Sequence, residues 1–156
     1  KFRRIIMAGN YWAPPGLHPT PAYQVSGVPW ISGSLTLRDD AEHKYKFPYV
    51  TQNIMVINHS SAKIRVHFAS KDSSGGGAIS GLHYVELDSD EDSISMNVKC
   101  TKLYVSTPAG SAGDREYRVI ASLTNIPSGS MADNALTGSG ITDIDSSANA
   151  GEDGME

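Results

Sequence analysis

The amino-acid sequence predicts an all-β fold, an antiparallel β-sandwich of about eight strands in a jelly-roll-like arrangement. Charged side chains make up only 19% of the 156 residues, against about 25% in an average globular domain, and serine, threonine, asparagine and glycine take their place. Short segments repeat apolar residues with a period of two. Turn-forming residues separate these segments at the short, regular spacing that is typical of sandwiches and barrels.

Charge and proline content divide the chain into an arm (1–30), a body (31–127) and a tail (128–156). The arm carries three basic residues, no acidic one and five of the eight prolines. Because proline fixes φ and lacks an N–H donor, we expect an extended, polyproline-like segment. Its aromatic side chains, among them Tyr11 and Trp12, need a surface to lie on.

The body contains eight candidate strands. In one of them Ile64 and Val66 alternate with Arg65 and His67, the pattern of a strand with one face in water. A seven-stranded immunoglobulin-like sandwich is the nearest competitor, but the Cys…Trp…Cys hallmark of that fold is missing. The predicted strands are 34–37, 44–47, 50–58, 63–69, 82–87, 93–99, 102–106 and 115–123.

The tail is rich in glycine, serine and alanine, with six acidic residues and no basic one. Met131, Leu136, Ile141 and Ile144 nevertheless recur through it. Such a segment cannot offset its own ordering entropy, so we expect it to become ordered only against a partner.

No constellation of residues predicts a catalytic, cofactor or metal site, and we do not expect an enzyme. The five histidines lack metal-ligand spacing, and we interpret His67 as a solvent-face strand residue. The acidic stretch 88–92 is interpreted as a hairpin turn, because Ser93 and Lys99 occupy the Gly and Glu positions of a calcium loop. Cys100 is interpreted as a small, partly buried residue, and the glycosylation-type triplet at Asn58 as chance.

Composition also argues against two classes of partner. The net charge of −4 does not provide the basic footprint that nucleic-acid binding requires. The longest wholly apolar runs are four residues, far short of the 18 or so that span a bilayer, so we expect a soluble chain without a membrane partner.

Over residues 30–127 the chain resembles small β-sandwich cement, decoration and minor capsid proteins of tailed phages and large DNA viruses. The resemblance lies in the succession of strand segments along the chain and not in a diagnostic motif. It implies a sandwich on a virus shell, often a trimer, with arms that reach neighbouring capsid subunits. It implies no catalytic residues, and it does not predict the long acidic tail. The segments that carry it are Phe47–Asn58, Ile64–Phe68, Leu82–Leu87, Lys102–Ser106 and Tyr117–Pro127.

Together these observations predict a structural virion protein that binds the major capsid protein, or other capsid subunits, through its terminal arms. A carbohydrate- or receptor-binding module is the alternative, with Trp30, Tyr45, Tyr49, Tyr84 and Tyr104 as candidate platform residues. The residues predicted to contact the partner are Phe2, Tyr11, Trp12, Met131, Leu136, Ile141 and Ile144.

Overall fold

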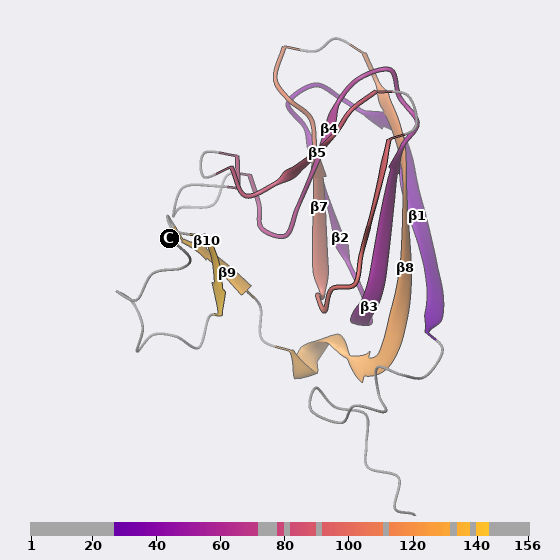
Figure 1. The fold of residues 1–156 in the computed structure, drawn as a ribbon, viewed down its shortest axis with the longest axis vertical. Helices are drawn as coiled ribbons and strands as arrows, with labels where there is room; N and C mark the ends of the chain where they lie inside the picture. The colour runs from indigo at the N-terminus through magenta and orange to yellow at the C-terminus, as the bar shows by residue number, and fades with distance from the viewer. Residues whose placement is uncertain are drawn as a thin grey trace, which may run out of the picture.

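The computed structural model confirms an all-β chain built on two four-stranded antiparallel sheets (Figure 1). The β1 sheet has the order β1-β8-β3-β6, with β1 at Val28–Leu37, β8 at Arg115–Pro127, β3 at Tyr49–Asn58 and β6 at Ser93–Met96. The β2 sheet has the order β2-β7-β4-β5, with β2 at Glu42–Lys46, β7 at Lys102–Ser106, β4 at Ile64–His67 and β5 at Val85–Leu87. The structure describes residues 27–71, 78–79, 82–89, 92–110, 113–131, 134–137 and 140–143.

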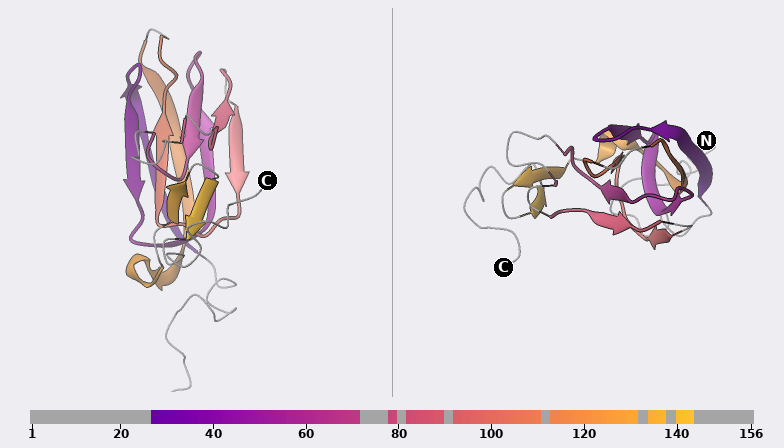
Figure 2. Two further views of the ribbon diagram at one scale, coloured as in Figure 1. Left: turned by 90° about the vertical axis from the view of Figure 1, so that its left-hand side faces the viewer. Right: turned by 90° about the horizontal axis from the view of Figure 1, so that it is seen from above.

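A short 3₁₀ turn, η1 (Ser128–Ser130), follows β8 and leads to a separate hairpin. The hairpin consists of β9 (Asn134–Thr137) and β10 (Gly140–Asp143), and it lies beside the sandwich, outside both sheets (Figure 2).

The strand pairing follows one simple rule. β1 pairs with β8, β2 with β7, β3 with β6 and β4 with β5, so each strand pairs with the one at the mirror position in the sequence. The additional pairs β3–β8 and β4–β7 join these four ladders into the two sheets. The body is therefore one long hairpin ribbon, β1–β4 running out and β5–β8 running back, rolled into two layers.

The hydrophobic core lies between the sheets. On β8 the alternate residues from Tyr117 to Leu123 are buried and face it, and Leu103 and Val105 of β7 meet them from the β2 sheet. On β4, Ile64 and Val66 are buried as the period of two predicts.

Most strand boundaries differ from the predicted ones by one to six residues, and two of the differences have a clear local cause. β1 begins at Val28, six residues before the predicted strand and inside the predicted arm. Pro29 is tolerated there because β1 is an edge strand, where a missing N–H breaks no ladder on the open side. β5 is only three residues long, because Leu82 adopts a left-handed backbone conformation with φ 58° and the chain still turns at that point.

Candidate interaction surface

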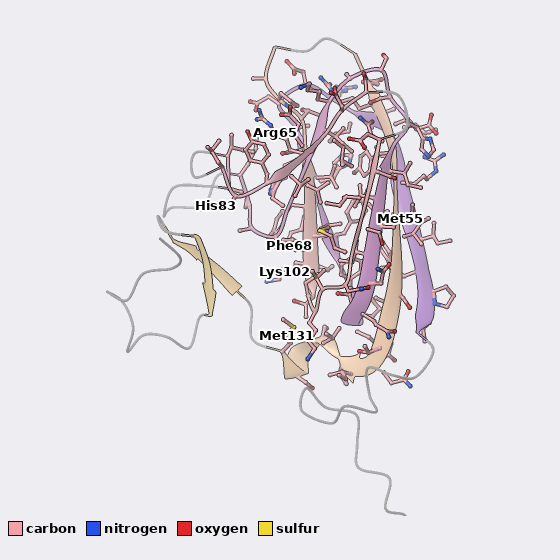
Figure 3. All side chains as sticks on the ribbon, viewed as in Figure 1. Met55, Arg65, Phe68, His83, Lys102 and Met131 are labelled. Atoms are coloured by element: carbon pink, nitrogen blue, oxygen red, sulfur yellow. The ribbon has the colours of Figure 1, made fainter. Side chains whose placement is uncertain are left out.

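The outer face of the β1 sheet carries an apolar stripe across three strands. Ile31 of β1 is in register with Ile120 of β8, which is in register with Met55 of β3. Figure 3 shows Met55 on this side of the sandwich. Ile31 is 67% exposed and Leu35, further along β1, is 62% exposed. We call Ile31, Leu35, Ile120 and Met55 the apolar stripe.

The stripe ends at an open sheet edge. Among the described elements β1 pairs only with β8, so its other side carries unpaired backbone N–H and C=O groups. Its ten residues include no charged side chain. Charged edge residues are one of the devices by which proteins discourage pairing with another chain, and β1 lacks them.

Gly33 allows β1 to lie unusually close to β8. A Cβ atom at this position would lie 2.4 Å from the carbonyl oxygen of Tyr117 and 3.0 Å from Cδ of Arg118, so no side chain fits. Arg118 is held in turn by Glu116, 2.8 Å away. A shallow depression results, lined by Ile31, Gly33, Leu35 and Arg118.

The outer face of the β2 sheet is covered in part, at His67, Tyr104 and Ser106, whereas Lys44 and Lys46 on β2 are exposed. The segment after β4 crosses the intervening β7 and reaches β2. There Ser70 Oγ donates to Glu42 Oε1 at 2.9 Å, and the Lys71 N–H donates to Glu42 Oε2 at 2.6 Å. Tyr104 alternates with the core residues Leu103 and Val105 of β7 and therefore lies on the outer face of the sheet. It is nevertheless buried beneath this cover.

The interpretation of His67 as a solvent-face residue is wrong. His67 is only 1% exposed, its ring stacks on Tyr104 at 5.8 Å, and its Nε2 is 2.8 Å from Ser106 Oγ. Burial lowers its pKa, because charging the imidazole in a dry environment is costly. Ser106 is also 1% exposed, so this serine–histidine pair is closed to a substrate in this structure.

A polar cluster lies between the sheets, near the β1 and β2 edges. Tyr117 Oη is 2.7 Å from Tyr45 Oη and 2.8 Å from His43 Nδ1, and Trp30 packs edge-on against Tyr45. Tyr117 is fully buried, and burial raises its pKa above the usual value. Sequence reasoning missed this cluster, because only the packing of the β2 sheet against the β1 sheet brings its members together.

Other groups singled out in the sequence have structural partners. Asn58 is fully buried and its Nδ2 donates to the carbonyls of Ala62 and Asp88, so its amide is not available for glycosylation in the folded chain. Cys100 is buried and burial raises the pKa of its thiol, despite the lysines nearby. Within the described part of the chain, no three metal-ligating side chains come together.

The predicted partner-binding residues are placed only in part. Phe2, Tyr11, Trp12 and Ile144 lie outside the described residues. Leu136 and Ile141 are register partners in the β9–β10 hairpin. Met131 is half-buried and lines a groove together with Lys46 and Lys102.

The five aromatic residues of the alternative hypothesis do not share a surface. Trp30 and Tyr45 pack against each other at the β1–β2 side, Tyr104 is buried on His67, and Tyr84 lies under the guanidinium of Arg65 at 4.6 Å. Tyr49, on β3, is 40% exposed. No single aromatic platform for a sugar ring is formed by them.

Comparisons of the chain with protein-family models, with curated proteins and with solved structures give no match. Among the described residues there is no helix of the length and apolarity that crossing a bilayer requires.

Proposed function

We propose that the chain is a jelly-roll structural subunit of a virus shell, a cement, decoration or minor capsid protein, that assembles through the open edge of β1 and the adjoining apolar stripe. The observation that carries this proposal is a ten-residue, uncharged edge strand with two highly exposed aliphatic side chains. Exposed aliphatic side chains beside unpaired backbone groups favour association with another protein.

The strand pairing supports the jelly-roll assignment. A ribbon in which β1 pairs with β8 and β4 with β5, rolled into two sheets, is the arrangement expected of an eight-stranded jelly roll. This architecture is found in viral capsid proteins, but also in lectins and cupins, so architecture alone does not select a function. The resemblance over residues 30–127 is what favours the capsid class in this proposal.

The arm comes immediately before the proposed contact surface in the sequence. Residues 1–26 lead directly into β1, so the predicted anchors Phe2, Tyr11 and Trp12 belong to the segment nearest in sequence to the open edge. An extended segment can add to such an edge as a further strand, with backbone hydrogen bonds giving affinity and side chains giving specificity. Each contact repeated by the symmetry of a shell would add avidity.

The assembly surface is tested by placing charge on it. Ile31→Lys combined with Leu35→Lys should leave the free energy of unfolding within about 0.5 kcal/mol, because both side chains are exposed. Sedimentation velocity of the full chain should show an oligomer, a trimer being the form that the resemblance implies, and the variant should be monomeric. The matched control is Ser95→Lys with Asn97→Lys, exposed positions at and beyond β6, the opposite edge strand of the same sheet.

A wild-type chain that stays monomeric at 100 μM, or a doubly charged variant that assembles as well as the control, would contradict the contact surface. The capsid class is tested separately: an antibody against the sandwich should label purified virus particles that contain this chain. Saturable binding on a glycan array without labelling would support the carbohydrate alternative instead.

A further inference from the structure

The structure defines which backbone groups face the open edge of β1. The carbonyl oxygen of Tyr117 faces β1, because a Cβ atom at Gly33 would lie 2.4 Å from it. The carbonyl of the preceding residue, Glu116, faces the other way and accepts from the N–H of His59, the residue after β3, at 2.9 Å. Backbone groups alternate in direction along an antiparallel ladder, so Ser34, the register partner of Tyr117, pairs with β8, and Gly33 is turned to the open side.

The stretch of the edge that a further strand can pair with is short. By the same alternation Ile31 presents both its N–H and its C=O to the open side, and Pro29, two residues earlier, has no N–H to offer. Toward the other end of β1, the N–H of Thr36 donates to Ser34 Oγ at 3.2 Å, and the register with β8 shifts. A further strand would therefore pair with residues 31–35.

The sequence of this stretch is symmetric about its centre. It reads Ile-Ser-Gly-Ser-Leu, with Gly33 in the middle, a serine on either side and an aliphatic residue at each end. In an antiparallel pair of identical strands centred on Gly33, serine lies opposite serine and Ile31 lies opposite Leu35. Aliphatic cross-strand pairs stabilise a sheet, and the uncharged strand brings no like charges together. The stretch is therefore complementary to itself.

We propose that a second copy of this chain pairs with β1 in antiparallel register, about a two-fold axis at Gly33. The side chains of Ile31 and Leu35, 67% and 62% exposed, then meet those of the partner on the outer face and are removed from water. The contact is isologous, and it joins the two four-stranded β1 sheets into one continuous sheet.

The surroundings of the stretch are compatible with this contact. Arg118 lines the same shallow depression as Ile31 and Leu35, but its guanidinium lies 2.8 Å from Glu116, so its charge is compensated within each copy. The apolar stripe of one copy would continue across the axis into the stripe of the other. In the left view of Figure 2, β1 lies at the margin of the sandwich, where a second sheet can approach.

This inference rests on the proposed function, because it names the partner of the same edge. A two-fold contact produces a dimer or another even-numbered oligomer, whereas the trimer that the resemblance implies would need a different use of the edge. An arm that adds to β1 as a strand would likewise exclude the contact.

Disulfide formation between Ser32→Cys and Ser34→Cys chains tests the register. In the proposed pair these positions are opposite each other with Cα atoms about 4.5 Å apart, a distance that a disulfide spans. An equal mixture of the full chains, the Ser34→Cys chain being ¹⁵N-labelled, should form at least fivefold more 32–34 disulfide than 32–32 or 34–34 disulfide in a glutathione buffer. The native Cys100 is buried. The matched control is Ser93→Cys mixed with Ser95→Cys, two exposed serines of the same spacing on β6, which should give no more than a tenth of that yield.

An excess of 32–32 or 34–34 disulfide would overturn the proposed register, and a mixed yield no higher than that of the control would overturn the inference. The proposed function is judged separately. If Ile31→Lys with Leu35→Lys converts an oligomer into a monomer while the 32–34 disulfide is not favoured, the inference fails and the assembly surface stands.

Amide hydrogen exchange distinguishes a second copy from the arm of the same chain. At a concentration where the full chain sediments as a dimer, the N–H groups of Ile31 and Gly33 should be protected, and dilution to the monomer should speed their exchange at least fivefold. The N–H of Ser32, which faces β8, should stay protected in both states. Slow exchange of Ile31 and Gly33 in the monomer would assign the edge to the arm and overturn the inference, as would fast exchange in the dimer.

Discussion

The outer faces of the two sheets differ in what covers them. On the β2 sheet, the polar side chains of His67 and Ser106 lie buried beneath the segment that follows β4. On the β1 sheet, the apolar side chains of Ile31 and Leu35 are exposed. The sandwich thus buries polar groups on one outer face and exposes apolar groups on the other, the reverse of what side-chain polarity alone favours.

The comparison shows that polarity along a strand does not determine which face is covered. The buried polar groups on the β2 sheet satisfy one another, since His67 contacts both Ser106 and the carbonyl of Ala69. Nothing comparable covers Ile31 among the described residues. Around His67 the β2 face is therefore covered by the chain itself, whereas Ile31 and Leu35 on the β1 face remain exposed.

The largest expected effect is a difference in the free energy of unfolding between substitutions on the two outer faces. Tyr104→Ala should lower the free energy of unfolding by about 3 kcal/mol or more, because it removes a buried ring and its stacking on His67. Ile31→Ala, on the uncovered face, should change it by less than about 0.5 kcal/mol. Urea denaturation of both variants measures the contrast. Equal losses of unfolding free energy in the two variants would mean that the two outer faces are equally packed and would contradict the difference described above.

An intermediate effect is expected from pH. Burial lowers the folded-state pKa of His67, so the unfolded chain takes up the proton first as the pH falls. The stability due to the neutral ring is complete above about pH 6.5, the unfolded value, and is lost as the pH falls toward the lower folded value. The Tm should therefore decrease between pH 7 and 5, and His67→Gln should reduce that slope.

Much of the fold was predictable because it depends on local pattern. The period of two in 63–69 and 115–123 identified β4 and β8, although β4 is shorter and β8 longer than the predicted segments. The start of β1 was not predictable, because it contains Pro29: a proline excludes a central strand, but an edge strand accepts it. That distinction depends on the order of strands in the sheet, which the local pattern does not contain.

The candidate surface was less predictable, because it depends on long-range pairing. Ile31, Ile120 and Met55 lie far apart in the sequence and form a stripe only through the β1–β8 and β3–β8 registers. The misinterpretation of His67 has the same origin. Its alternation with Val66 correctly placed it on the outer face, but the segment that buries that face makes its contacts with β2.

The smallest expected effect locates the limit of the cover. Glu86 on β5 lies 2.8 Å from Lys63 and 3.3 Å from Arg65, and the hydrogen bond from Lys63 lowers the pKa of the Glu86 carboxyl. The ion pair with Lys63 therefore stabilises the fold at pH values above the ordinary carboxyl pKa. This stabilisation is lost as the pH falls through the lowered pKa. Glu86→Gln should cost less than about 1 kcal/mol and less still in 0.5 M NaCl, because water reaches this pair. The contact of Arg65 with Tyr84 should persist. A loss above about 2 kcal/mol in urea denaturation would mean that the cover over the β2 sheet extends across β5, since only a buried pair is that costly to break.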